Sequence, residues 1–360
     1  MLKQGRACLF AAISASILST TTAFADEIAS LDKHGDITAM CGKKPAFVAF
    51  QDGFGGATWF KTAAAEVKDE LSKCPTVTKF VYLDANNDQQ RYNSDINGIV
   101  AQGANIVITF AHFGDSSLPL FKSVKRAGVV MVPYFSKIGG EIGKDYDGTV
   151  LMDQESAGLR WADWFSKSVV KGNVIFLGGT PGATSSERFL AGLKKGLAKY
   201  PDLKLLDEHY VVTNWNPVDA QKAVAALIAK YDKIDGIATD YGVTTMAAIK
   251  AYEQAGLPVP AQASIASNNE LNCKYLDLKK QGKAWRYYSL DGTTTLVRFA
   301  ARRAMSIYEG TPDTEPVAVQ PFVYADSTTG LDPKCDPSLP PDADMSGQLG
   351  DEKLKKLLAP

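Results

Sequence analysis

The residue types that most often carry chemistry occur in two glycine-rich turns. The first turn, QDGFGGATWF at residues 51–60, contains Gly53, Gly55 and Gly56. Such glycines can bring a backbone close to a dinucleotide phosphate, but the G-x-G-x-x-G spacing is absent. The second turn, GGTPGATS at 178–185, could cradle a phosphate, yet it lacks the Lys-Ser/Thr pair of a P-loop. We therefore expect no cofactor.

The sequence also lacks a pairing of nucleophile and base. It has no G-x-S-x-G elbow, no H-E-x-x-H motif and no Ser-x-x-Lys in a plausible nucleophile turn. His112 follows a predicted strand, where a hydrogen-bonding or stacking role suits it better than that of a base. The chain has 3 histidines and no C-x-x-C pair, which disfavours a metal site. This pattern indicates reversible binding rather than catalysis.

The elements that must position these residues are clearest between residues 80 and 133. An apolar run ends at Leu83, a polar turn follows, and a helix with an apolar stripe stops at Gly103. Residues 105–110 are then apolar on both faces, as a strand covered by helices on each side must be. The unit repeats up to residues 129–132. Two consecutive βαβ units predict an α/β fold with a doubly wound parallel sheet and a cleft at the strands' carboxyl ends.

The same pattern starts again in the second half of the chain. A loop rich in glycine and charge and a short apolar strand at 149–152 come first. The later strands are predicted at 173–177, 203–212, 236–239, 264–266 and 285–289, with helices between them. From residue 332 the chain is rich in Pro, Asp and Gly, which predicts an irregular tail.

Composition and the N-terminus limit the class of protein. The 360 residues suffice for two domains, and the net charge of -1 gives no sign of nucleic-acid or anionic-membrane binding. Lys3 and Arg6 precede a short apolar run, and Ala23-Phe24-Ala25 precedes Asp26. This is the pattern of a secretory signal at 1–25, cleaved after Ala25. A membrane anchor is the alternative, but the apolar run is too short to span a bilayer.

Four cysteines remain beyond the predicted signal, and they allow three pairings. Cys41 and Cys74 each precede a strand of the first sheet. Neighbouring parallel strands lie about 5 Å apart, so cysteines at their N-terminal ends are within disulfide reach. Cys273 and Cys335 would then pair by elimination, tying the tail to the second lobe.

Several motifs together resemble a known family. They are DANNDQQ with the following I-x-x-x-V-A-Q-G-A-N-I-V-I, then GVVMVP, SSER-x-x-A-G-L and SIASNNE. With the signal, they resemble periplasmic sugar-binding proteins of ABC transporters, of the ribose/galactose/xylose type, over roughly residues 46–323. Repressors related to that family begin with a helix-turn-helix, whereas a secretion signal stands here.

The resemblance implies a type I periplasmic binding protein with two Rossmann-like lobes joined by three hinge segments. The N-terminal lobe would comprise residues 26–145 and 290–314. The C-terminal lobe would comprise residues 146–289 and 315–335, and residues 336–360 would form the tail.

In that family, aromatic rings sandwich a sugar ring and polar side chains bind its hydroxyls. Carried onto the first lobe, this implies ligand contacts from Asp52, Phe54 and Trp59, although burial at the start of a helix would also explain Trp59. Where the family usually has Asp-Arg, this chain has Tyr134-Phe135. The exchange removes a charged pair and favours a smaller, less hydroxylated or linear ligand.

In the second lobe the family's arginine corresponds to Glu187 or, with a one-residue shift, to Arg188. We favour Arg188 because a guanidinium can donate to two hydroxyls at once, and a surface ion pair is its alternative role. Trp215 matches a stacking aromatic. Asp240 and Asn268 end strands where relatives place Asn or Asp, and helix capping is their alternative. Asp291 lies at the third crossing, where the family commonly has Gln or Asn, and the resemblance implies that it too contacts the ligand.

The resemblance implies a monomeric periplasmic protein that captures a sugar or polyol and delivers it to an ABC permease without catalysis. An exported sensor serving a chemoreceptor or a histidine kinase would have the same fold and site. A periplasmic hydrolase or isomerase is the remaining alternative, against which the missing nucleophile motif argues.

Overall fold

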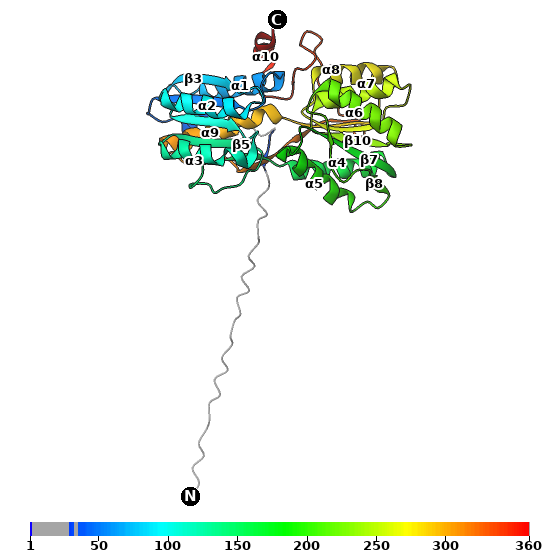
Figure 1. The fold of residues 1–360 in the computed structure, drawn as a ribbon, viewed down its shortest axis with the longest axis horizontal. Helices are drawn as coiled ribbons and strands as arrows, with labels where there is room; N and C mark the ends of the chain where they lie inside the picture. Colours follow the sequence, from blue (N-terminus) through cyan, green and yellow to red (C-terminus); the bar gives the residue numbers. More distant parts are fainter. Residues whose placement is uncertain (2–28, 32–34, 360) are drawn as a thin grey trace.

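The computed structural model describes Met1, residues 29–31 and residues 35–359, which form two lobes lying side by side (Figure 1). Apart from Met1, the predicted signal peptide lies outside the described residues. Each lobe contains one sheet with helices on both faces, which confirms the predicted fold class. Within the described ranges, no helix combines the length and apolar character needed to cross a bilayer.

The described strands of the first sheet are all parallel. In spatial order they are β1 (Ala29–Ser30), β13 (Ala318–Gln320), β6 (Val150–Met152), β5 (Val130–Phe135), β4 (Ile106–Phe110), β2 (Ala46–Asp52) and β3 (Val77–Asp84). The covering helices are α1 (Thr58–Leu71) and α9 (Leu296–Glu309) on one face, and α2 (Gln89–Ala101) and α3 (Leu118–Arg126), preceded by η2 (Gly114–Ser117), on the other. Val48 and Phe50 of β2 pack in the core with α1 and α9, whereas Phe47 and Ala49 pack with α2 and α3. The alternation of side chains along a strand thus explains its apolar run.

The second sheet is also mainly parallel. Its described strands run in the order β14 (Phe322–Asp326), β12 (Tyr287–Asp291), β11 (Ala261–Ile265), β10 (Gly236–Thr239), β7 (Gly172–Gly178) and β8 (Leu203–Leu205), with β9 (Val211–Val212) also paired to β7. Only β14 is antiparallel among these described strands. The single strand predicted at 203–212 is wrong, because polar residues 207–209 separate two short strands.

Helices cover both faces of the second sheet as well. They are α4 (Gln154–Ser168) and α5 (Thr184–Leu197) on one face, and α6 (Pro217–Lys230), α7 (Gly242–Gln254) and α8 (Asn269–Lys280) on the other. Two glycines let the backbones of α4 and α5 meet. A Cβ on Gly192 would lie 2.1 Å from the carbonyl oxygen of Glu155, and one on Gly158 would lie 2.3 Å from that of Phe189. This close approach explains the glycine of the A-G-L motif.

The chain crosses between the lobes at three places, and two predicted boundaries need correction. Strands β6 and β13 both belong to the first sheet, so the crossings follow Met152 and Gln320 rather than residues 145 and 314. The loop before β6 returns within the first lobe, because residues 150–152 extend the sheet beyond β5. The remaining crossing follows Asp291, close to the predicted boundary at 289.

The tail is more ordered than its composition suggested. It ends in the helix α10 (Asp351–Leu358), which corrects the prediction of an irregular segment at 336–360. Its apolar side chains form a cluster of their own beside α1: Leu339, Ala343, Met345, Leu349 and Leu354. Figure 1 shows the tail passing between the lobes to reach α10 at the edge of the molecule.

Polar contacts attach the tail to both lobes. In the second lobe, the side-chain amide of Asn269 donates to the carbonyl oxygens of Asp336 and Leu339, at 2.7 and 3.1 Å. In the first lobe, Glu66 Oε1 accepts the backbone N–H groups of Gln348 and Leu349, at 2.7 and 2.9 Å. The tail therefore straps one lobe to the other beside the crossings.

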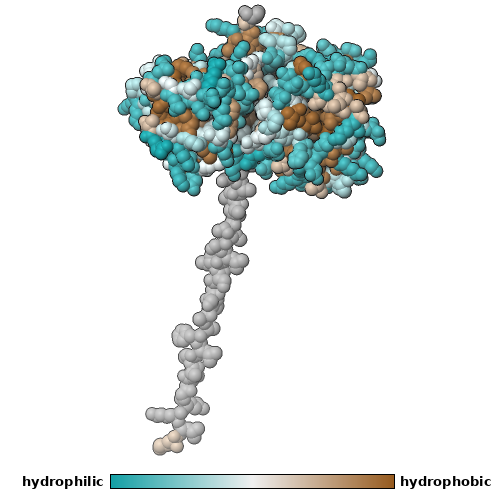
Figure 2. Space-filling model, in the orientation of Figure 1, coloured by the Kyte–Doolittle hydropathy of each residue, from teal (hydrophilic) through white to brown (hydrophobic). Residues whose placement is uncertain are grey.

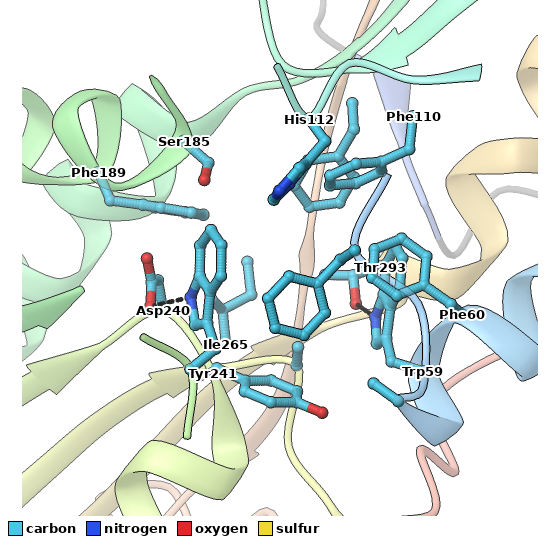
Figure 3. A pocket seen from close by; sticks show the side chains of 15 residues that line it. Trp59, Phe60, Phe110, His112, Ser185, Phe189, Asp240, Tyr241, Ile265 and Thr293 are labelled. Carbon is cyan, nitrogen blue, oxygen red and sulfur yellow. Dashed lines mark hydrogen bonds between the residues drawn. The ribbon is translucent and has the colours of Figure 1, made fainter. Parts of the chain in front are cut away.

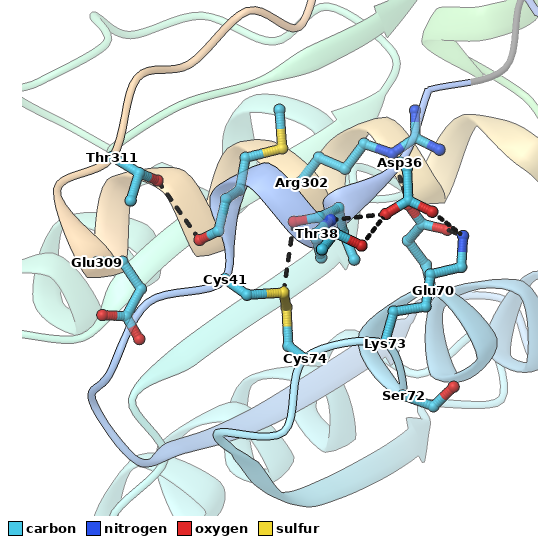
Figure 4. The surroundings of a disulfide bond; sticks show 12 residues. Asp36, Thr38, Cys41, Glu70, Ser72, Lys73, Cys74, Arg302, Glu309 and Thr311 are labelled. Carbon is cyan, nitrogen blue, oxygen red and sulfur yellow. Dashed lines mark hydrogen bonds and ion pairs between the residues drawn. A yellow bond between two sulfur atoms is a disulfide. The ribbon is translucent and has the colours of Figure 1, made fainter.

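Both predicted disulfides are present. Cys41 follows η1 (Ile37–Met40), and its Cα lies 5.3 Å from that of Cys74 (Figure 4). Cys273 of α8 bonds to Cys335, with a Cα separation of 4.9 Å. The second bond fixes the start of the tail strap to the second lobe.

Replacing Cys273 and Cys335 together with serine should lower the free energy of unfolding by about 2–4 kcal/mol, because the bond closes a long loop in the unfolded chain. Denaturant unfolding monitored by circular dichroism measures the change. Brief proteolysis should also cut the variant earlier between residues 335 and 350 than the parent. An unchanged midpoint together with an unchanged cleavage pattern would contradict this role.

The visible outer surface is mainly hydrophilic. Figure 2 shows hydrophilic side chains over most of the visible face of both lobes. Exposed large hydrophobic residues such as Ile142, Val170 and Leu257 lie on separate segments of the chain. Single exposed hydrophobic side chains of this kind are normal on protein surfaces.

Candidate functional site

A cluster of aromatic residues at the strands' carboxyl ends lines a cleft between the two lobes, here called the inner cleft (Figure 3). Fifteen of the described residues line about 630 Å³ of space. The first lobe contributes Phe54, Ala57, Trp59, Phe60, Phe110, His112, Phe135 and Thr293. The second lobe contributes Ser185, Phe189, Trp215, Asp240, Tyr241, Ile265 and Ala266. The cleft lies where the doubly wound topology predicts a binding site.

The aromatic rings hold one another at edge-to-face angles. The Trp59 ring centroid lies 4.8 Å from that of Phe60 and 5.6 Å from that of Phe135. Across the cleft, Phe54 of the first lobe meets Trp215 of the second at 5.7 Å and 83°. Such contacts favour fixed ring orientations, so the walls of the cleft are pre-organised.

Backbone strain accompanies this arrangement. Phe135, Trp215 and Ala266 all line the cleft, and all have positive φ angles of 83°, 49° and 52°. Non-glycine residues rarely adopt this conformation, and they do so most often at functional sites. At Phe135 it lets two adjacent residues serve different purposes: Tyr134 stays in the first lobe's core, while Phe135 turns toward the cleft.

Trp59 fits both of the roles considered for it. It lies near the start of α1 with only 7% of its surface exposed, and it lines the cleft. Its indole Nε1 donates to Thr293 Oγ1 at 2.8 Å (Figure 3). Thr293 belongs to η3 (Thr293–Thr295), directly after a crossing, so this bond ties α1 to the hinge.

Trp215 and Asp240 form a unit in the second lobe. The indole Nε1 of Trp215 donates to Asp240 Oδ1 at 2.9 Å, and Ser186 Oγ donates to Oδ2 at 2.5 Å. Burial raises the pKa of Asp240 to about 6, against the opposing effect of these two donors. The Trp215 ring covers Gly179, where a Cβ would come within 2.1 Å of it. Any larger residue at position 179 would clash with the indole ring, so glycine is required for this position of Trp215.

His112 is neutral at physiological pH. Burial lowers the pKa of its imidazole to about 4. Its Nε2 donates to the side-chain oxygen of Asn87 at 2.8 Å, which leaves Nδ1 as an acceptor. His112 thus suits the predicted hydrogen-bonding or stacking role.

Four predicted ligand-binding residues make structural contacts instead and do not line the inner cleft. Asp52 accepts from Tyr82 and from the N–H of Gly55, the latter at 2.6 Å, and so shapes the first turn. Burial raises its pKa to about 6. Asn268 caps α8 by accepting the N–H of Leu271 at 2.9 Å, which is the alternative role considered for it.

The other two are Tyr134 and Asp291. Tyr134 is fully buried in the first lobe's core. Asp291 Oδ2 accepts from the N–H and Oγ of Ser267, at 3.0 and 2.6 Å, and its Oδ1 accepts from Ser346 of the tail at 3.0 Å. Asp291 therefore joins the hinge to the tail strap. Burial, with a contribution from Asp344, holds its pKa well above the usual value.

Arg188 lies at a second, more polar space, here called the outer opening. This space is lined by residues that include Asn87, Asp115, Lys137 and Arg188, and His112 borders both spaces. Arg188 Nη1 lies 3.3 Å from Glu155 Oε1, so it forms the ion pair considered as its alternative. The outer opening is therefore lined by more polar residues than the inner cleft, and the two spaces meet at His112.

Several cleft residues were not predicted. Phe110 lies two residues before the predicted His112, and Tyr241 directly follows the predicted Asp240, so their positions at strand ends carried a usable signal. Phe60 and Phe189 lie on helices, where an aromatic residue at a core-facing position looks like ordinary packing. Thr293 lies directly after a crossing between the lobes, and sequence patterns do not reveal the geometry of that crossing.

Two parallel α/β lobes, joined by three crossings around an aromatic cleft, define the class of two-lobed binding proteins. The family model described as a periplasmic binding protein domain matches residues 48–286, and the chain belongs to this family. This confirms the family that the sequence motifs suggested.

Two curated relatives and two solved structures give the comparison more detail. A xylitol-binding protein of Mycolicibacterium smegmatis is 26% identical over 205 residues, covering 56% of this chain and 57% of its own length. The D-xylose-binding periplasmic protein of Escherichia coli is 27% identical over 183 residues, covering 50% and 54%. The chain thus spans little more than half the length of these relatives.

Among solved structures, a Caulobacter myo-inositol-binding protein with bound myo-inositol has a TM-score of 0.68 and 23% identity, covering 80% of this chain and 96% of its own. A periplasmic solute-binding protein of an ABC transporter from Actinobacillus succinogenes, with bound D-allose, has a TM-score of 0.67 and 18% identity, covering 79% and 98%. At these identities the likeness shows a shared fold.

Proposed function

We propose that this protein is a monomeric solute-binding component of an ABC import system in the periplasm. It captures a sugar or sugar-like polyol between its lobes and delivers it to a membrane permease. The observation that carries this proposal is the inner cleft, which both lobes build from aromatic rings at the strands' carboxyl ends. The names of the curated relatives support the ligand class.

The chemistry of the cleft suits such a ligand. The C–H faces of a sugar ring are weakly positive and stack on the negative faces of aromatic rings. Ligand hydroxyls can donate to the Asp240 carboxylate and to His112 Nδ1. Contacts from both lobes stabilise a closed state over an open one, which is how ligand binding biases hinge motion.

The contacts in the cleft do not support catalysis. Ser185, His112 and Asp240 are the residue types of a hydrolase triad, and all three line the cleft. Yet His112 bonds to Asn87, and Asp240 bonds to Ser186 and Trp215. Among the described residues, Ser185, His112 and Asp240 form no hydrogen bond with one another of the kind that links a hydrolase triad.

Equilibrium binding tests this function. The chain from Asp26 onward would be titrated calorimetrically with pentoses, hexoses and linear and cyclic polyols after a thermal-shift screen. We expect at least one ligand to bind at one site per chain, more tightly than millimolar, and to be recovered unchanged after incubation. If no member binds more tightly than millimolar, the proposed function is wrong.

Ligand affinity should fall as the pH drops below about 6. A hydroxyl that donates to Asp240 stabilises the ionised carboxyl, so binding lowers its pKa and releases a proton near pH 6. Since the pKa of Asp240 is about 6, affinity should be constant above that pH and about ten-fold weaker at pH 5. His112, with its pKa of about 4, stays neutral over this range.

Calorimetry at several pH values, with Asp240→Asn as the control, measures this dependence. The variant should bind more weakly at pH 7 and should show no pH dependence between 5 and 8. A parent protein with the same affinity at pH 5 and pH 8 would contradict a role for Asp240 in ligand binding.

A further inference from the structure

The inner cleft offers few polar groups to a ligand. No Arg, Lys, Asn or Gln occurs among the fifteen described residues that line it. Both tryptophan N–H groups are already used, by Thr293 and by Asp240. The acceptors left for a ligand are the remaining lone pairs of Asp240 and the Nδ1 of His112, and the hydroxyls come from Ser185, Tyr241 and Thr293.

These polar groups are separated by aromatic surface. Figure 3 shows Ser185 and Asp240 on the side of the second lobe, Thr293 on the side of the first lobe, and the rings of Phe60, Phe110 and Phe189 between or beside them. A fully hydroxylated sugar carries a donor and acceptors around its whole edge. Several of its hydroxyls would therefore face carbon, and each hydroxyl buried without a partner weakens binding by about ten-fold.

The charged groups in and around the cleft further restrict the class of ligand. Asp240 is buried with no cationic partner among its described contacts, and the neutral imidazole of His112 supplies no positive charge. The cationic residues Lys137 and Arg188 line the outer opening instead. An acidic sugar or a sugar phosphate would place its negative charge against rings and a carboxylate, at a large desolvation penalty.

From these observations we infer that the inner cleft selects a ring compound without negative charge, with apolar faces and with fewer hydroxyl groups than a common pentose or hexose, two of them directed at Asp240 and His112. This inference rests on the proposed function and narrows its ligand class. Two sources share this chemistry: deoxygenated sugars and hydroxylated aromatic alcohols. Phe135 is the residue that sets the preference, because its ring packs against Phe110 at 4.9 Å and Trp59 at 5.6 Å, where a polar pair was expected.

The test compares matched ligands by calorimetry on the full mature chain. One arm pairs D-galactose with 6-deoxy-D-galactose and D-ribose with 2-deoxy-D-ribose. A second arm uses benzyl alcohol and 4-hydroxybenzyl alcohol, and a third uses glucuronate and choline as charged probes. We expect the less hydroxylated member of a sugar pair to bind about ten-fold more tightly or better, and glucuronate not to bind.

The outcomes separate this inference from the proposed function. Tight binding of the aromatic alcohols alone would support the inference and overturn the sugar assignment. Equal or tighter binding of the fully hydroxylated sugars would overturn the inference and leave the proposed function standing. Tightest binding of choline or glucuronate would overturn the inference. Binding of none of the probes would also overturn the inference, whereas the proposed function is decided by the wider panel of pentoses, hexoses and polyols.

A variant pair tests the assignment to Phe135. Phe135→Asn adds hydrogen-bonding capacity to the cleft wall. This variant should bind the deoxygenated sugar at least about ten-fold more weakly than the parent does, and the ratio of the two affinities within each sugar pair should become smaller. Phe135→Leu keeps an apolar wall and should preserve that ratio. Identical ratios in both variants would show that another residue sets the preference.

Discussion

Replacing Trp215 with alanine should weaken ligand binding by about a hundred-fold without unfolding the protein. Large aromatic side chains at the centre of a binding site commonly contribute 2 kcal/mol or more. Trp215 supplies both a ring that reaches across to Phe54 and the N–H that orients Asp240. It is only partly buried and packs outside the lobes' cores, so its loss should leave the fold intact.

Two further variants separate the effects of the ring from those of the fold. Trp215→Phe keeps an aromatic face but removes the N–H, so it should lose less affinity than the alanine variant. Trp285→Phe serves as a matched control, because Trp285 packs with Tyr275 and Tyr287 in the second lobe, away from the cleft. If Trp215→Ala binds within about three-fold of the parent, the inner cleft is not the ligand site.

Replacing Arg298 with methionine should lower the free energy of unfolding by about 3–5 kcal/mol, because it leaves the buried carboxylate of Glu66 without its cation and removes one of the two arginines that bond to Glu70. Arg298 of α9 bonds to Glu66, to Asp69 at 2.8 Å and to Glu70 at 2.9 Å. Only 2% of its surface is exposed, and Glu66 and Glu70 are fully buried. Glu66 also holds the tail through its bonds to Gln348 and Leu349, so the tail strap should loosen too.

The effect of Arg298→Met should depend on pH. Burial already raises the pKa of Glu66 even with Arg298 present. Without the guanidinium its pKa rises further, and the unfavourable ionised form is avoided once the pH falls below that value. The variant's loss of stability should therefore be larger at pH 8 than at pH 5.

Urea unfolding at both pH values measures this loss. Lys353→Ala is the control, because it removes only an exposed partner of Asp69 and should change stability by less than about 1 kcal/mol. A change of similar size in the two variants would contradict the role assigned to Arg298.

Sequence patterns predicted the fold well where segments were long. The buried strands β2, β4 and β7 were apparent from apolar runs, and the pairing of Cys41 with Cys74 followed from their order. Short elements were harder to assign: β6 was predicted as a strand but placed in the wrong lobe, and β13 was not predicted. Three-residue strands such as β6 and β13 are too short to show a periodic pattern of apolar residues. Only their pairing with neighbouring strands shows that they belong to the first lobe. The tail's apolar residues form a cluster although their spacing follows neither helix nor strand.

In the site, the sequence predicted aromatic residues better than polar ones. Phe54, Trp59, Phe135 and Trp215 all line the cleft. Of the acidic and amide residues at strand ends, Asp240 lines it too, while Asp52 and Asn268 stabilise a turn and a helix end. The reason is physical: a side chain that can bind a ligand hydroxyl can equally accept a backbone N–H.

A crystal structure of the protein with its tightest ligand tests the central claim most directly. We predict electron density for one ligand in the inner cleft, in contact with Trp215, with one hydroxyl within hydrogen-bonding distance of Asp240. Both lobes should contact it. Density confined to the outer opening or to one lobe's surface, with the aromatic cleft unchanged, would contradict capture of the ligand between the lobes.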